Sequence, residues 1–209
     1  MNAEDFLDAV RDDNETALSR LGSSKSLYAA TGGEMDPEDV FRAAADSEYA
    51  AAETFEEWAD SEDDDTAREV FAETADEERD HYEKVVGKLG EDHEPSEVPA
   101  LHEYLRGVED TQGRVGGLLG RILASDQSKS QMVGFFVGQA DPQTAQLFRD
   151  LGDDLDGQLE RATDLLEEVC ESDDDYERAK EAAGGAIQAA YEEYTESLES
   201  MGVNPKPVC

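Results

Sequence analysis

The strongest constraint on the fold comes from two apolar stripes with helical spacing, each interrupted by polar residues. Between Val70 and Leu89 the apolar residues fall on one helical face, and Glu78 and His81 occupy the gap in that face. Between Pro37 and Asp60 a similar stripe has Glu48 at its missing position. Acidic and imidazole side chains are costly to bury unless their charge and hydrogen bonds are satisfied. The pattern therefore predicts two long helices that bring three polar side chains into a helical core, where a metal ion would hold them.

The positions of these residues along their helices support the same interpretation. The acidic run from Asp60 to Asp64 suits a solvated turn, with Glu48 about 12 residues before it and Glu78 about 14 residues after it. At ~1.5 Å per residue both lie roughly 18 to 21 Å from the turn. On antiparallel helices, Glu48 and Glu78 should therefore lie level with each other.

Length and composition predict an all-α protein built around one domain. The chain has 209 residues with abundant alanine and glutamate, few prolines and no segment that alternates like a strand. Helices are expected over residues 3–21, 37–60, 64–89, 101–107, from there to about 137, 142–170 and 176–201, with an interruption near Gly113 to Gly117. The expected organisation is an N-terminal helix and linker (1–34), a four-helix bundle (35–171), a C-terminal helix (172–203) and a flexible tail (204–209).

The charge of the chain constrains its surroundings and its partners. There are 54 acidic residues against 17 lysines and arginines, which gives a formal net charge of −37. Such a surface repels itself in ordinary salt and suits concentrated salt, where screening is strong. We therefore expect the cytoplasm of a halophilic, archaeon-type cell. Direct nucleic-acid binding is not expected, because it depends on clusters of lysine and arginine.

Neither a membrane segment nor a cysteine-based site is expected. The longest apolar run, Met132 to Gly138, is too short to span a bilayer, and the N-terminus is acidic where a secretory signal would be basic. Cys170 closes an apolar stripe and should be a buried thiol, whereas Cys209 lies in the tail. Two cysteines cannot form a four-thiolate metal site. His93 and His102 lie in or beside a connection and are expected at the surface.

The segments 46–50 and 72–81, which carry Glu48, Glu78 and His81, resemble the ferritin-like superfamily and within it the rubrerythrin-like branch. In that family two helical hairpins each supply a Glu from one helix and a Glu-x-x-His from the next. The resemblance covers residues 37–168 and implies an up-down four-helix bundle with a long crossover. It also implies iron, or alternatively manganese, with Glu48 as a terminal ligand, Glu78 as the bridging carboxylate and His81 as the imidazole ligand.

The second half of the chain departs from the family pattern. A weak internal repeat places Leu155 and Gln158 where the second Glu-x-x-His should stand, and the preceding helix offers only Asp126 or Gln127 at the matching level. The resemblance thus supplies only the first half-site. A single metal could bind the triad with water or Asp126, or two chains could pair as a homodimer that completes the site. The triad could also be a hydrogen-bonded cluster without metal.

Two functional hypotheses follow, and the sequence leaves open whether the protein is an enzyme. The first is a ferritin-like metal protein with a partial carboxylate-histidine site that handles iron, oxygen or peroxide. The second is a non-catalytic helical interaction or scaffold protein that kept the fold, lost the di-metal centre and binds a protein partner. Leu155 and Gln158 motivate the second hypothesis, together with the added first and last helices.

Overall fold

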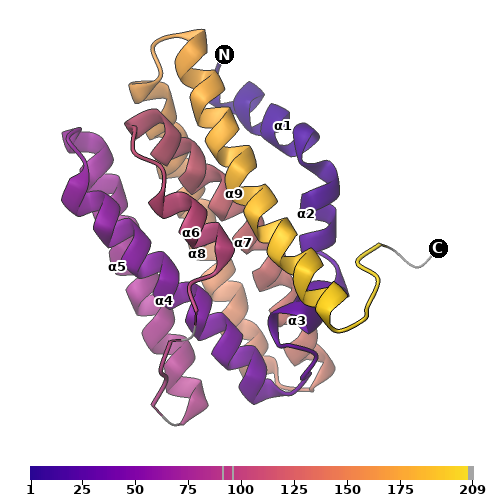
Figure 1. Ribbon diagram of the computed structural model, residues 1–209. Helices are drawn as coiled ribbons and strands as arrows, with labels where there is room; N and C mark the ends of the chain where they lie inside the picture. Colours follow the sequence, from indigo (N-terminus) through magenta and orange to yellow (C-terminus); the bar gives the residue numbers. More distant parts are fainter. Residues whose placement is uncertain (91, 96, 207–209) are drawn as a thin grey trace.

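The computed structural model describes residues 1–90, 92–95 and 97–206, and within these ranges the regular structure is entirely helical (Figure 1). The predicted all-α class is therefore confirmed. The helices are α1 (Ala3–Asp13), α2 (Glu15–Leu21), α3 (Ser24–Ala30), α4 (Pro37–Ser61), α5 (Asp65–Leu89), α6 (Ala100–Arg106), α7 (Thr111–Gly138), α8 (Pro142–Val169) and α9 (Asp173–Ser200). In the described ranges, no helix is both long and apolar enough to cross a membrane.

Two antiparallel hairpins, α4 with α5 and α7 with α8, lie side by side, with α4 and α5 along one side of the molecule (Figure 1). Their boundaries follow local chemistry. Asp36, Asp64, Asp110 and Asp141 each cap the start of one of these four helices by accepting a backbone N–H bond. Gly90 ends α5 with a φ of 72°, a left-handed conformation that glycine adopts without strain. The expected hairpin boundaries are thus met to within one or two residues.

The fifth long helix, α9, packs closely against α7. A Cβ atom at Gly116 would lie 1.9 Å from the backbone oxygen of Ala179, and one at Gly120 would lie 2.3 Å from that of Ala183. These glycines let the two helix backbones approach each other. The expected interruption of the helix near Gly113 to Gly117 is therefore wrong: α7 is continuous there, and the break falls earlier, between α6 and α7.

The terminal segments pack against each other. The expected single helix over residues 3–21 is divided at Asn14, and the short helix α3 was not predicted. Ser197 of α9 donates a hydrogen bond to the backbone oxygen of Ala29. Of the tail that was expected to be flexible, Pro205 accepts a hydrogen bond from the Tyr194 hydroxyl at 3.3 Å, whereas Cys209 lies outside the described residues.

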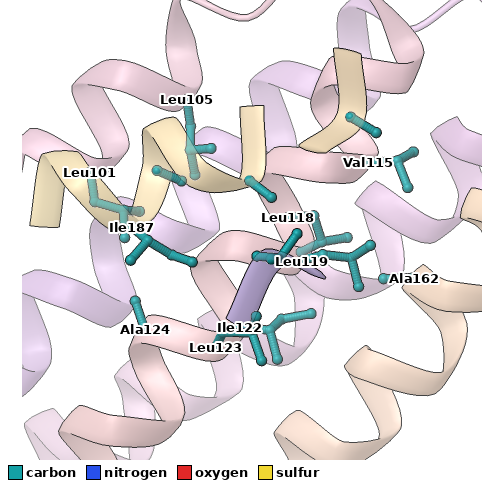
Figure 2. Close-up of a cluster of buried hydrophobic side chains, with 14 of the residues drawn as sticks. Leu101, Leu105, Val115, Leu118, Leu119, Ile122, Leu123, Ala124, Ala162 and Ile187 are labelled. Atoms are coloured by element: carbon teal, nitrogen blue, oxygen red, sulfur yellow. The ribbon is translucent and has the colours of Figure 1, made fainter. Parts of the chain in front are cut away.

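The apolar core consists of two clusters that a polar layer separates. The larger cluster, part of which is drawn in Figure 2, contains Ala51 of α4 and Ala75 of α5. The smaller cluster contains Ala45 of α4 and Val85 of α5. The polar positions 48, 78 and 81 lie between these pairs along the two helices. The hairpins thus carry a polar layer through an otherwise apolar interior.

Candidate functional site

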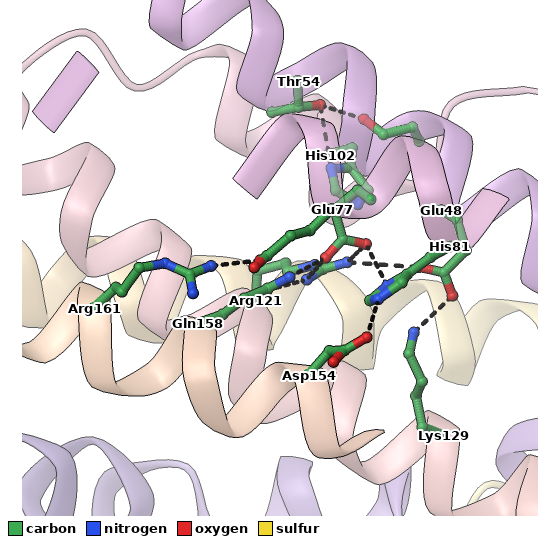
Figure 3. A network of polar contacts seen from close by, with 12 residues as sticks. Glu48, Thr54, Glu77, His81, His102, Arg121, Lys129, Asp154, Gln158 and Arg161 are labelled. Carbon is green, nitrogen blue, oxygen red and sulfur yellow. Dashed lines mark hydrogen bonds and ion pairs between the residues drawn. The ribbon is translucent and has the colours of Figure 1, made fainter. Parts of the chain in front are cut away.

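Glu48 of α4 and Glu78 and His81 of α5 meet in the polar layer (Figure 3). Each side chain offers one potential ligand atom, and these three atoms lie within 4.8 Å of one another. All three residues are buried, with exposed fractions of 1%, 0% and 1%. The structure therefore brings together the residues that interrupt the two apolar stripes, as their helical phase and level predicted.

Two cations from α7 enter the same layer, and sequence reasoning missed both. Arg121 donates from Nη1 to Glu78 Oε1 at 2.8 Å and from Nη2 to Glu78 Oε2 at 2.6 Å. Lys129 Nζ donates to Glu48 Oε1 at 2.6 Å. Arg121 is fully buried and Lys129 is 5% exposed. Each buried carboxylate therefore already has a cationic partner from within the chain.

Helix α8 completes the layer with two polar side chains. Gln158 Nε2 donates to Glu78 Oε1 at 2.6 Å, and its Oε1 accepts from Arg121 Nη1 at 3.1 Å. Asp154 Oδ2 lies 3.0 Å from His81 Nε2. Because a carboxylate only accepts, His81 Nε2 must carry the proton of this hydrogen bond. The weak internal repeat aligned Gln158 with the Glu-x-x-His of the first half, and Gln158 does lie in the layer. The repeat did not indicate Asp154, which directly precedes the buried Leu155.

The alternative in which Asp126 joins the triad is wrong. Asp126 is exposed, and Gln127 lies beside Gly22, away from the polar layer. The residues of α7 that reach the layer are instead positions 121 and 129, one on each side of the expected level. Arg121 lies between Leu119 and Ile122 in an apolar run, which was the only local signal that it is buried.

The charges in the layer shift the pKa values of its acids and its histidine. Burial raises the pKa of Glu48, and the Lys129 ammonium opposes that rise only in part. Burial would also raise the pKa of Glu78, but the charge of Arg121 holds it well below its usual range. Burial lowers the pKa of His81, yet the carboxylates of Glu78 and Glu48 raise it by more. Glu78 is therefore the firmly ionised member of the layer.

Three buried atoms of the layer lack a hydrogen-bond partner among the described residues: Glu48 Oε2, His81 Nδ1 and Arg121 Nε. His81 Nδ1 lies 4.0 Å from Glu48 Oε2 and 3.7 Å from Glu78 Oε2, beyond hydrogen-bonding distance from both. If His81 is neutral, its Nδ1 lone pair faces carboxylate oxygens that also only accept. A proton on Nδ1 or a small cation between these atoms would relieve the mismatch.

The donor set does not fit a di-metal centre. With His81 neutral, Arg121 and Lys129 already balance Glu48 and Glu78, so two divalent ions would leave a large uncompensated buried charge. Unit charges 4 Å apart interact by about 4 kcal/mol at an effective dielectric constant of 20, and the repulsion between a divalent ion and a guanidinium is about twice that. The Nη2 atom of Arg121 lies only 3.9 Å from Glu48 Oε2, the oxygen that a metal would use.

The remaining candidate residues lie elsewhere. Cys170 is buried as expected, and burial raises the pKa of its thiol to about 11. The expectation that His93 and His102 lie at the surface is wrong. The His102 residue is 2% exposed, and the His93 side chain is 4% exposed and lies 3.0 Å from Asp46. His102 lies on α6, which packs against α4, and His93 contacts Asp46 of α4 and Tyr82 of α5.

The chain was compared with protein-family models, curated proteins and solved structures, and none of the three comparisons gave a match.

Proposed function

We propose that this chain is a non-catalytic helical protein that acts by binding a partner, and that an internal ion network occupies the place of a di-metal centre. The single observation that carries the ion-network part of the proposal is the two-point contact of Arg121 with Glu78. An arginine stays charged at any physiological pH, so it satisfies the carboxylate permanently. A bridging metal ligand would need those same oxygens.

The surrounding contacts support the same proposal. Lys129 occupies one oxygen of Glu48, and Gln158 adds a third hydrogen bond to Glu78. The triad is enclosed by α7 and α8 of its own chain. A second copy would therefore have no direct access to the triad, so we do not propose that a homodimer completes a metal site.

Metal analysis of the purified protein tests this proposal. After anaerobic incubation with Fe²⁺ or Mn²⁺ and removal of unbound ions, we expect much less than one ion per chain. The variant Arg121→Glu, combined with Lys129→Met, should gain metal binding because it replaces two cations by one carboxylate. Arg79→Glu combined with Lys84→Met is the matched control, since it makes the same charge change at exposed pairs of α5. Stoichiometric metal in the wild type that is lost in His81→Ala would overturn the proposal.

A second candidate is a mononuclear iron or manganese site at Glu48, Glu78 and His81. The observation that favours it is the unpartnered pair Glu48 Oε2 and His81 Nδ1, since an unprotonated imidazole nitrogen and a carboxylate oxygen suit either ion. The same metal analysis separates the two candidates. A single ion per chain that depends on both Glu48 and His81, and that is retained with Arg121 in place, would support the second.

A further inference from the structure

A cavity of about 360 Å³ lies between α4 and α7, on the side covered by α3, α6 and α9. Its volume is at the small end of the range of about 300 to 1,000 Å³ that is usual for ligand sites. The cavity is distinct from the ion network, although Ser47 and Ser128 of its wall directly precede Glu48 and Lys129 in the chain.

A buried histidine lines this cavity and contacts a threonine hydroxyl. His102 lines the cavity and is 2% exposed, and its Nδ1 lies 3.2 Å from Thr54 Oγ1. The Thr54 hydroxyl donates its proton to the backbone oxygen of Ala50 at 2.7 Å and accepts from Arg106 Nε. The Thr54 oxygen therefore accepts from His102 as well, which places the imidazole proton on Nδ1 (Figure 3).

The other nitrogen of this ring is then an unprotonated acceptor. Among the described residues, His102 Nε2 has no hydrogen-bond partner. Burial and the nearby Arg121 charge lower the pKa of His102 to about 3, so the ring stays neutral near neutral pH. A ligand that uses Nε2 must bring a hydrogen-bond donor.

The charged residues of the cavity also favour a ligand that brings hydrogen-bond donors. Asp46, Glu97 and Glu193 line it, and none of its described lining residues is a lysine or an arginine. Glu97 and Glu193 also line a shallow groove outside the cavity, where Glu103, Glu192 and Glu196 join them. Acidic side chains thus continue from the cavity to the surface.

The rest of the wall is small and largely apolar. Leu101 and Met132 contribute apolar surface, and serines such as Ser125 contribute hydroxyl groups that can accept. The cavity therefore combines acceptors for N–H groups with apolar surface for methylene groups, and its outer groove is acidic.

We propose that the cavity between α4 and α7 binds a linear organic polyamine. One amino group donates to His102 Nε2 inside the cavity, the methylene chain lies along the apolar wall, and a second amino group lies among the carboxylates of the groove. This proposal goes beyond the proposed function, because it would stand even if the polar layer bound a metal ion.

Calorimetric titration with spermidine tests the proposal at a fixed, high KCl concentration that screens nonspecific attraction to the acidic surface. We expect saturable binding of one spermidine per chain and no competition by Mg²⁺ at equal charge concentration. His102→Phe keeps an aromatic ring but removes the acceptor, and it should weaken binding about tenfold or more. Ala124→Leu fills the cavity from α7 and should weaken binding at least as much.

Matched variants separate binding in the cavity from general attraction to the acidic surface. Glu97→Gln with Glu193→Gln should weaken binding strongly. Asp156→Asn with Glu160→Gln changes the net charge equally on the exposed face of α8 and should change binding by less than about twofold. Thermal unfolding of each variant verifies that it is folded. If Ala124→Leu does not fold, Ala43→Leu replaces it and fills the cavity from α4.

Three results would overturn the proposal. These are an absence of saturable binding, equal weakening by both double variants, and trilysine binding that exceeds spermidine binding and is insensitive to cavity filling. The last result would assign the groove to a basic peptide. Because the metal analysis and this titration measure different sites, either proposal can fail without the other.

Discussion

Arg121 donates two hydrogen bonds to Glu78, at 2.8 and 2.6 Å, and both side chains are fully buried. The arginine also lies against the Phe55 ring, with its guanidinium carbon 5.7 Å from the ring centroid. An ion pair so far from water adds less net stability than its geometry suggests, because desolvation offsets the attraction. Its removal is nevertheless costly, since the partner that remains is a buried, uncompensated charge.

Arg121→Met should therefore destabilise the protein by about 3 to 5 kcal/mol, because it leaves Glu78 without its main cation. Urea denaturation at constant KCl concentration measures this loss without changing the ionic strength. The double variant Arg121→Met with Glu78→Leu should be more stable than the single variant, since it buries no unpaired charge.

Arg79→Met provides the surface comparison for this experiment. Arg79 pairs with Glu56, and both side chains are about half exposed. Its loss should cost no more than about 1 kcal/mol. A similar small cost for Arg121→Met would contradict the buried ion pair.

Lys129→Met should make stability depend more steeply on pH. The folded-state pKa of Glu48 is already raised by burial, and Lys129 is the largest influence that lowers it. Without the lysine, the folded protein favours protonated Glu48 more strongly, so stability is retained at low pH and lost as pH rises through the folded-state pKa. The difference from the wild type should grow with pH by up to about 1.4 kcal/mol per unit. Urea midpoints measured from pH 5 to 9 test this, and a pH-independent difference would contradict it.

The sequence predicted one half of the polar layer because that half is visible as an interruption of local periodicity. Glu48, Glu78 and His81 each replace an apolar residue in a regular helical stripe. Arg121 and Lys129 do not give such a signal, since long basic side chains also occur at the edges of apolar faces. Their burial depends on where α4 and α5 lie relative to α7. That information is tertiary, so the charge balance that decides the chemistry could not be predicted.

The same dependence on tertiary contacts explains why an interruption of α7 was wrongly predicted. Glycine lowers helix propensity by about 1 kcal/mol relative to alanine, so three glycines within five residues suggest an interruption. The approach of α9 reverses this interpretation, because Gly116 and Gly120 are the positions where the α9 backbone lies too close for a Cβ atom. Tertiary packing here compensates for poor local propensity.

Gly116→Ala and Gly120→Ala should each destabilise the protein by about 3 kcal/mol, because the new methyl group would overlap the backbone of α9 and force the helices apart. Gly134→Ala in the same helix is the matched control. A Cβ atom there would meet nothing within 4 Å, so the change should stabilise by about 0.5 to 1 kcal/mol through helix propensity. Urea midpoints compare the three variants, and equal effects at all three positions would rule out the close approach.

His102 should make the protein less stable in acid. Its pKa is about 3 in the folded state and 6.5 in the unfolded chain, so below pH 6.5 the unfolded chain gains a proton that the folded protein excludes. Stability from this source is complete above pH 6.5 and is lost as pH falls toward 3. The loss approaches about 1.4 kcal/mol per pH unit, or roughly 5 kcal/mol in total.

The variant His102→Gln isolates this contribution from the titration of the acidic surface. Glutamine can still donate to Thr54 Oγ1 but does not titrate, so the variant should be less stable than the wild type at pH 8 and should lose that disadvantage as the pH falls. Urea denaturation of both proteins between pH 8 and pH 4 gives the difference directly. Parallel stability curves would show that the folded protein admits the proton, and that burial and the Arg121 charge do not keep His102 neutral.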